Sequence, residues 1–167
     1  FIQDGRIYLV ISLQRKRKRK SEIQRPRYTY ALMKIPYTRL PRFVELPSHQ
    51  GFHYIMFIED MIKANLHSVF PGYDIVDCYS IKISRDADFS LENEDQKDIA
   101  EKILKKVRKR KIGAVTRFQY DRNMPPYFLK YLCDTYEIEE EELLPSGRYL
   151  NLAELAELPN PVGEKLY

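Results

Sequence analysis

Two short apolar runs near the start of the chain predict a pair of β-strands. GRIYLVISL and RYTYALMKIP are both rich in β-branched and aromatic residues, a composition typical of strands. A polar connection from Gln14 to Arg27 separates them, so the pattern predicts a β-hairpin with a long loop. Pro36 and Pro41 are expected to end regular structure after the second strand.

Apolar runs and helical periodicity alternate through the middle of the chain. FHYIMFI predicts a strand, and EDMIKANLHSVF continues it as a helix with Asp60 as a candidate N-cap. IVDCYSIKI and AVTRFQY predict two further strands. Between them, ENEDQKDIAEKILKKVRKRKIG predicts the longest helix, because its acidic residues gather at the start, its basic residues at the end, and Gly113 follows.

The last third of the chain predicts two more helices and completes the fold class. NMPPYFLKYLCDTY begins with prolines, which favour a first helical turn, and places Phe128, Leu129, Leu132 and Cys133 on one face. LAELAEL predicts a short final helix. Strands and helices are mixed without a strict βαβ repeat, so we expect an α+β fold with a mixed, largely antiparallel sheet, flanking helices and a single domain.

Composition indicates a globular domain and bears on its cellular compartment. The chain has 167 residues, 44% of them apolar and 13% aromatic, enough to bury a core. Cys78 and Cys133 lie in apolar segments and indicate reduced, buried thiols. Reduced thiols are typical of cytosolic proteins and no apolar run is long enough to span a membrane, so we expect a cytoplasmic protein, with peripheral membrane association left open. The chain begins at Phe1 without Met, which is typical of a piece of something longer.

Charge is strongly segregated along the chain. Residues 1–42 hold twelve Lys or Arg against two Asp or Glu, a net charge of +10, whereas residues 134–167 have a net charge of −7. Two ends of one domain, or two copies of it, could attract each other, although separate solvated faces are an equal alternative. Six consecutive basic residues stand in the predicted hairpin loop: Arg15, Lys16, Arg17, Lys18, Arg19 and Lys20.

Residues suited to catalysis are sparse. There is no glycine-rich phosphate loop and no CxxC, and His49, His53 and His67 lack the spacing of a metal site. In KISRDADFSLEN, Asp86 and Asp88 beside Arg85 could hold Mg²⁺ or position a base, but an Arg–Asp pair that fixes a turn is favoured. The residues alone therefore do not indicate a self-contained enzyme.

A second polar segment precedes the last predicted helix. In PSGRYLNLAEL, Gly147 allows a tight turn, Arg148 offers a bidentate fork for phosphate or carboxylate, and Asn151 can cap the helix. A purely structural turn is the alternative for this segment as well.

Four segments in this order resemble a known family. RYTYALMKIPYTRLPRFVELP, FIEDMIKANLHSVFPGYDIVDCYSIKISRDADFSLENED, VTRFQYDRNMPP and SGRYLNLAELAELPNP are similar to the middle, or head, domain of long-form bacterial polyphosphate kinase. The resemblance covers residues 1–161, and residues 162–167 would begin a linker to a C-terminal catalytic domain. The fold that it implies is the α+β fold already expected from the pattern.

The resemblance implies a function for the parent enzyme rather than for this part alone. The family reversibly transfers the terminal phosphate of ATP to inorganic polyphosphate, using Mg²⁺ and a phosphohistidine in another domain. No histidine here matches that motif, so the head domain is expected to be non-catalytic, to be inactive alone, and to hold no cofactor or metal. It is expected to support subunit association into a homo-oligomer, contacts with the other domains of its parent chain, and the polyphosphate tunnel.

Three arginines within the family-like segments are candidates for contact with polyphosphate or a neighbouring domain: Arg42, Arg85 and Arg148. Asp86 and Asp88 are expected to orient Arg85 or cap its turn. The basic loop extends the family pattern, and it could bind polyphosphate by counterion release, with plain solvation as the alternative. A nucleic-acid- or polyanion-binding module is the alternative function, although nucleic acid is disfavoured because no aromatic stacking platform accompanies the charges. A metal-dependent hydrolase that uses Asp86 and Asp88 is a third possible function.

Overall fold

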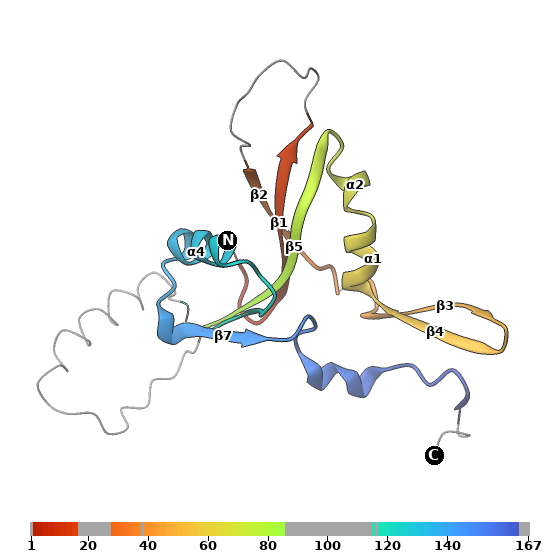
Figure 1. Cartoon of the computed structure of the whole chain (residues 1–167). Helices are drawn as coiled ribbons and strands as arrows, with labels where there is room; N and C mark the ends of the chain where they lie inside the picture. Colours follow the sequence, from red (N-terminus) through yellow and green to blue (C-terminus); the bar gives the residue numbers. More distant parts are fainter. Residues whose placement is uncertain (1, 17–27, 38, 86–114, 116, 164–167) are drawn as a thin grey trace, which may run out of the picture. The chain divides into compact units, whose positions relative to one another are not determined.

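The computed structural model describes residues 2–16, 28–37, 39–85, 115 and 117–163 (Figure 1). The strands of these ranges are β1 (Ile7–Arg15), β2 (Tyr28–Lys34), β3 (Phe43–His49), β4 (Phe52–Phe57), β5 (Tyr73–Ser84), β6 (Arg117–Asp121) and β7 (Leu143–Ser146). The α-helices are α1 (Ile58–Ala64), α2 (Leu66–Val69) and α4 (Pro126–Tyr136), and the 3-10 helices are η1 (Glu140–Glu142) and η2 (Leu152–Glu157).

Hydrogen-bonded strand order confirms the predicted fold class. Five strands form one sheet in the order β2-β1-β5-β6-β7, and β3 and β4 form a separate two-stranded sheet. β1 pairs antiparallel with β2 and β5 antiparallel with β6, whereas β6 and β7 are parallel. The protein is therefore α+β with a mixed, largely antiparallel sheet.

The residues group into two compact units that share strand β5. Unit 1 consists of residues 1–7 and 81–148, and unit 2 consists of residues 8–80 and 149–167. Each unit is described by itself below, for the residues that the structure describes.

The N-terminal strand provides much of the core of unit 2. The apolar run predicted to be a strand is β1, and its residues from Tyr8 to Leu13 are all buried. A continuous apolar run, rather than an alternating one, is typical of a strand that is covered on both faces. Leu9 and Ile11 are fully buried, as is Ser12, whose hydroxyl has no hydrogen-bond partner among the described residues.

The predicted N-terminal hairpin is confirmed with longer strands. Gln14 lies opposite Tyr28, and β1 continues to Arg15, so the first two residues assigned to the loop belong to the strand. Lys16 follows the strand. Its backbone N–H donates to the carbonyl of Gly72, and its ammonium lies 3.9 Å from a carboxylate oxygen of Asp74. The rest of the basic run lies outside the described residues: Arg17, Lys18, Arg19 and Lys20.

The single helix predicted after FHYIMFI is in fact two short helices, and its predicted cap is wrong. α1 begins at Ile58 with Phe57 at the N-cap, and Asp60 lies inside the first turn, where the helix dipole favours a carboxylate. The helix ends at Ala64, and the side-chain amide of its C-cap residue, Asn65, donates to the carbonyl of Met61 at 2.8 Å. This local hydrogen bond replaces a helical one, and α2 starts at the next residue.

Two strands were not predicted from the pattern, because each contains a proline. β3 includes Pro47 and β7 includes Pro145. Proline cannot donate to a sheet, but it is tolerated in edge strands, and both of these strands lie at an edge. The long helix predicted from residue 92 onward lies outside the described residues.

The proline-initiated helix of unit 1 is confirmed. Pro126 is the first residue of α4, and Phe128 and Leu132 form its buried face. Leu129 and Cys133, predicted on the same face, are only partly buried. The helix ends at Tyr136, and its C-cap residue, Glu137, adopts the left-handed conformation with φ 54°.

Candidate functional site: a buried arginine cluster

Arg42 stands at the entry to β3 in unit 2, and its side chain is almost completely removed from water. Only 4% of that side chain is exposed. A guanidinium cation is stable in such a place only when carboxylates and carbonyls replace its hydration. The sequence predicted Arg42 as a contact to polyphosphate or a neighbouring domain, and the structure shows its partners within unit 2.

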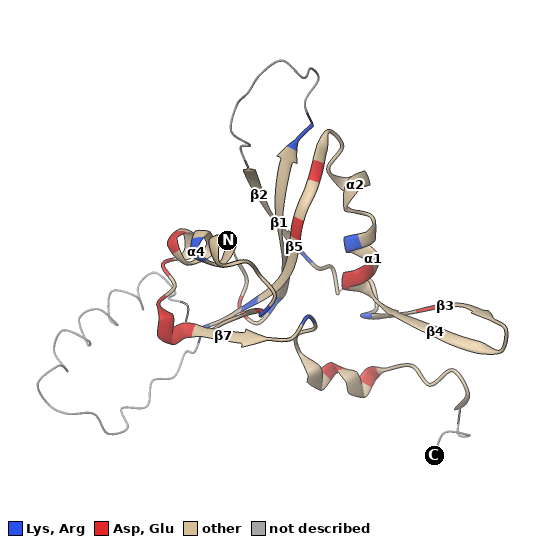
Figure 2. Ribbon diagram, viewed as in Figure 1, with Lys and Arg blue, Asp and Glu red and all other residues tan. Residues whose placement is uncertain are grey.

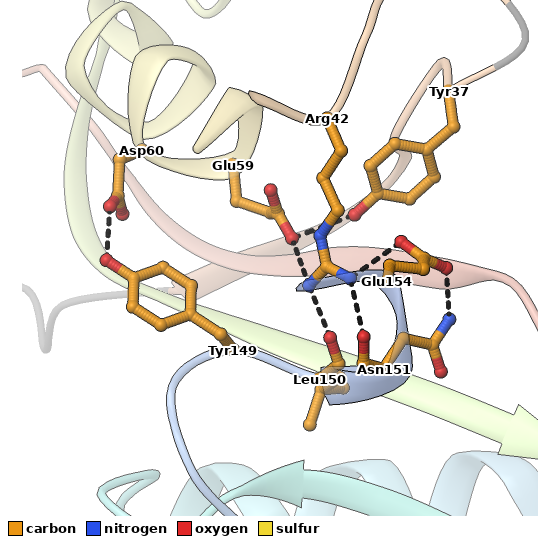
Figure 3. Close-up of polar contacts among 8 residues, drawn as sticks. All are labelled: Tyr37, Arg42, Glu59, Asp60, Tyr149, Leu150, Asn151 and Glu154. Atoms are coloured by element: carbon orange, nitrogen blue, oxygen red, sulfur yellow. Dashed lines mark hydrogen bonds and ion pairs between the residues drawn. The ribbon is translucent and has the colours of Figure 1, made fainter. Parts of the chain in front are cut away.

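The guanidinium binds two segments that are distant in sequence (Figure 3). Its Nη1 donates to the carbonyl of Asn151 at 2.9 Å and to a carboxylate oxygen of Glu154 at 2.6 Å. Its Nη2 donates to the carbonyl of Leu150 and lies 3.1 Å from Oε1 of Glu59 in α1. Arg42 therefore joins the start of β3, the first turn of α1 and residues 150–154 of unit 2.

Neighbouring side chains orient both carboxylates. The Tyr37 hydroxyl donates to Oε1 of Glu59 at 2.8 Å, and the Asn151 amide donates to Oε1 of Glu154 at 2.9 Å. The guanidinium carbon also lies 5.5 Å from the centre of the Phe57 ring, within the range of a cation–π contact. Each carboxylate therefore has a second partner besides Arg42.

The network is not completely satisfied. Arg42 Nε and Glu59 Oε2 are buried and have no hydrogen-bond partner among the described residues. A buried ion pair of this kind adds little net stability compared with an apolar pair, but removing one partner leaves an uncompensated charge. The cluster therefore specifies which segments pack together, and removing one of its charges should lower the free energy of unfolding.

Tyr37 is fixed as a hydrogen-bond donor. Burial raises the pKa of its hydroxyl well above the ordinary value, and the negative charge and hydrogen bond of Glu59 raise it further. The phenol therefore stays protonated throughout the neutral range and keeps donating to Glu59.

A second contact fastens the same segment to α1. The Tyr149 hydroxyl donates to Oδ2 of Asp60 at 2.5 Å, and its ring stacks on Phe57 with centroids 4.0 Å apart and planes 14° apart. Sequence reasoning missed both Tyr149 and the partners of Arg42. The one available signal was the pair of acids in the first turn of α1, which is also common at exposed helix starts.

The predicted capping role of Asn151 is wrong in its geometry. Asn151 does occupy the N-cap position of the last helix, η2, but its side chain makes no cap hydrogen bond. The residue is left-handed, with φ 55° and ψ 58°, so its amide reaches Glu154 instead. Asparagine tolerates this conformation better than other non-glycine residues.

Arg85 serves a different part of the protein, at the end of β5 in unit 1. Its backbone N–H donates to Oδ1 of Asp4 at 2.6 Å, and its Nη1 donates to the carbonyl of Ile2 at 2.7 Å. Gly5 adds a backbone hydrogen bond to Ile83. Asp86 and Asp88 lie outside the described residues, so their orienting role stays a prediction.

Arg148 is exposed in the turn between Gly147 and Tyr149. The structure therefore separates the three candidate arginines into a buried side chain, a partly buried one and an exposed one. Their predicted contact with polyphosphate or with another domain stays a prediction.

The remaining reactive residues have unreactive surroundings. Burial raises the pKa of the Cys78 thiol to about 11 and also raises that of Cys133, so both thiols are protonated at neutral pH.

His49 ends β3 and His53 lies in β4, where its Nδ1 is 3.2 Å from the Ser48 hydroxyl. In the described ranges no three His, Cys, Asp or Glu residues gather as a metal site would need. None of the helices in those ranges combines the length and apolarity of a membrane span.

Comparison with known proteins identifies the family. The family described as "Polyphosphate kinase middle domain" matches residues 1–158. This chain belongs to that family. The middle-domain resemblance inferred from the sequence is thus confirmed, and Arg42, Arg85 and Arg148 all lie within the matched range.

Individual relatives agree with the family match. The polyphosphate kinase of Vibrio vulnificus (strain YJ016) is 31% identical over 166 residues, which are 96% of this chain and 22% of that protein. The polyphosphate kinase of Vibrio cholerae is 34% identical over 139 residues, 80% of this chain and 20% of the relative. The crystal structure of polyphosphate kinase from Porphyromonas gingivalis matches with a TM-score of 0.72 and 43% identity, covering 99% of this chain and 22% of that one. This middle domain therefore spans about a fifth of the length of its relatives.

Proposed function

We propose that this chain is the non-catalytic middle domain of an enzyme that reversibly transfers the terminal phosphate of ATP to inorganic polyphosphate. The observation that carries the proposal is the 43% identity to a polyphosphate kinase of known structure across 99% of the chain. ATP and Mg²⁺ would act in other domains of the parent protein, which we place in the cytoplasm.

The environment of the reactive side chains is consistent with a domain that takes no direct part in catalysis. Both thiols have raised pKa values, and the most deeply buried arginine binds carboxylates and carbonyls of its own unit. A catalytic group needs access to substrate and a pKa matched to its task. The domain would instead contribute to subunit association, to contacts between domains and to the path of the polyphosphate chain.

A comparison of the parent polypeptide with this chain tests the proposal. Each is purified and incubated with ATP and Mg²⁺, and polyphosphate formation and ATP consumption are measured together. The parent should form polyphosphate, and the 167-residue chain should form none. Synthesis by the chain alone would overturn the non-catalytic role, and a parent that forms no polyphosphate would overturn the activity.

The basic loop provides a separate test of polyphosphate binding. Replacing Arg17, Lys18, Arg19 and Lys20 by Gln in the parent should weaken binding of long polyphosphate. It should also reduce the dependence of log affinity on log salt by roughly 3, at about 0.7 per neutralised contact with a single-stranded polyanion. Unchanged affinity and slope would show that the loop is only solvated. Tighter binding of RNA than of polyphosphate would favour the nucleic-acid alternative.

Subunit association has its own measurement. The opposite net charges of residues 1–42 and 134–167 support an attraction between copies, which ionic strength should weaken. Sedimentation of the parent at low and high salt should show a homo-oligomer that dissociates as salt rises. A monomer under both conditions would rule out this role.

A further inference from the structure

The last helix of unit 2 carries a line of exposed leucines. Leu152 is 66% exposed, Leu155 43% and Leu158 48%, and Val162 follows at 37%. Leu152 and Leu155 are three residues apart in η2, which is one full turn of a 3-10 helix, so they share one side of it, and Leu158 follows at the same spacing as the C-cap residue. We call Leu152, Leu155 and Leu158 the leucine ridge.

The ridge is more than the scattered apolar exposure of an ordinary surface. Single exposed leucines are normal, but apolar side chains that adjoin one another usually mark a contact surface. None of the residues in η2 is buried, so this helix adds little to the core of its own unit. A helix with an exposed apolar side and no buried residue is expected to contact a further partner there.

The polar cluster around Arg42 holds this helix at its start. Arg42 binds the carbonyls of Leu150 and Asn151 and the carboxylate of Glu154, and Leu150 itself is only 2% exposed (Figure 3). The Tyr149 contact with Asp60 adds a second attachment just before it. The helix is thus held by residues 149–151, which precede the ridge, and by Glu154 within it, while the leucines remain exposed.

We infer that the leucine ridge is the docking surface for another domain of the same parent polypeptide, one that presents an apolar groove with a basic rim. The inference rests on the proposed function. The family is a middle domain, and the match covers only 22% of the Vibrio vulnificus protein, so most of the relatives' polypeptide lies outside it. A domain in the same polypeptide has a high effective concentration and needs no separate encounter.

The charge near the ridge disfavours a second copy of this chain as the occupant. It also indicates that the groove of the partner domain has a basic rim. Residues 150–163 contain Glu154 and Glu157 but no Lys or Arg, and Figure 2 shows both acids on this helix. Glu154 is already paired with Arg42, so the exposed acid is Glu157. Two-fold pairing of ridges would bring Glu157 toward its own copy, because an isologous interface matches a patch to itself. Like charges across an interface disfavour association, whereas a basic rim would attract it.

Cysteine labelling in the parent polypeptide tests the inference. Leu155→Cys and, as a matched control, Val69→Cys, whose native residue is 52% exposed in the same unit, are each treated with a maleimide under native conditions. Labelling is followed peptide by peptide by mass spectrometry, which separates the new thiols from Cys78 and Cys133. The cysteine at 155 should react on the order of tenfold more slowly than that at 69, because a docked surface must open before it reacts.

Equal labelling rates at the two positions would overturn the inference. Protection at 155 that disappears when the parent is diluted until it is monomeric would also overturn it, because the occupant would then be a second copy. Hydrogen exchange of residues 150–163 in the unmodified parent gives the same decision if Leu155→Cys does not fold, with slow exchange in the monomer as the expected result. Phosphate transfer is assayed separately, so a parent with a protected ridge and no polyphosphate synthesis would overturn the proposed function alone.

Discussion

Arg42 and Arg85 are both arginines at the end or start of a strand, yet they lie in opposite environments. Arg42 in unit 2 has a side chain that is 4% exposed and faces two carboxylates and two carbonyls. Arg85 in unit 1 is partly buried, and its guanidinium donates to the backbone carbonyl of Ile2. The first replaces nearly all of its hydration by protein groups, whereas the second retains part of it.

Residue type and local sequence therefore do not determine how much an arginine contributes to the free energy of unfolding. A desolvated charge depends on every partner, because losing one partner leaves another charge buried without compensation. Truncating a partly solvated arginine should cost less, because water can replace the hydrogen bonds that its partners lose. The two sites should therefore respond very differently to substitution.

The largest expected effect is that of Arg42→Met. Methionine retains much of the volume of the side chain but leaves Glu59 buried without its cation, so the free energy of unfolding should fall by about 3–5 kcal/mol. Urea titration of the purified chain measures this. Arg39→Met is the matched control, because Arg39 is exposed in the same loop, and its effect should be within about 0.5 kcal/mol. A loss below about 1 kcal/mol for Arg42→Met would contradict the contrast between the two sites.

Arg85→Ala should have an intermediate effect, about 1.5 kcal/mol, the usual worth of a hydrogen bond from a charged group. The loss should be local. Amide hydrogen exchange at Gly5, whose N–H donates to Ile83, should accelerate because the N-terminal segment loses its attachment at Ile2. Exchange in residues 150–157 serves as the internal control and should be unchanged. Acceleration at both places, or at neither, would be evidence against a local role.

A smaller effect is expected at Asn151, which gives Arg42 its carbonyl in a left-handed conformation. Asn151→Gly and Asn151→Ala both remove the amide that orients Glu154. They differ in backbone strain, so the alanine variant should be less stable than the glycine variant by about 1 kcal/mol. Thermal unfolding of the two variants side by side measures the difference. Equal midpoints would mean that the left-handed conformation is not retained.

The pH dependence of the stability of unit 2 should show the contribution of the Tyr37 hydroxyl. Its folded-state pKa lies above the ordinary value of 10.0, so the unfolded chain loses this proton first as pH rises. The contribution of Tyr37 to stability is therefore complete below about pH 10 and declines above it. Wild-type stability should fall more steeply above pH 10 than that of Tyr37→Phe, measured by urea titration from pH 8 to 11. Parallel pH profiles would show that the hydroxyl is not held by Glu59.

The sequence predicted those elements whose pattern reflects burial directly. The continuous apolar run of β1 and the prolines that open α4 are local signals, and both elements were predicted correctly. Strands β3 and β7 were missed because their prolines obscure strand character and their place at an edge is a property of the sheet. Arg42 stood out through its family-like segment, but its partners at Asn151 and Glu154 are 109 and 112 residues away. No local pattern encodes contacts at that separation.

A double-mutant cycle tests most directly whether Arg42 acts for the fold of its own domain. The free energy of unfolding is measured for the wild type, Arg42→Met, Glu59→Leu and the double variant. Arg42→Met leaves Glu59 buried without its cation, and Glu59→Leu removes the more deeply buried of the two carboxylates that pair with Arg42. The double variant should therefore be less destabilised than the sum of the two by at least about 2 kcal/mol. Effects that add to within about 0.5 kcal/mol would contradict the direct pairing of Arg42 with Glu59 as the basis of the cluster.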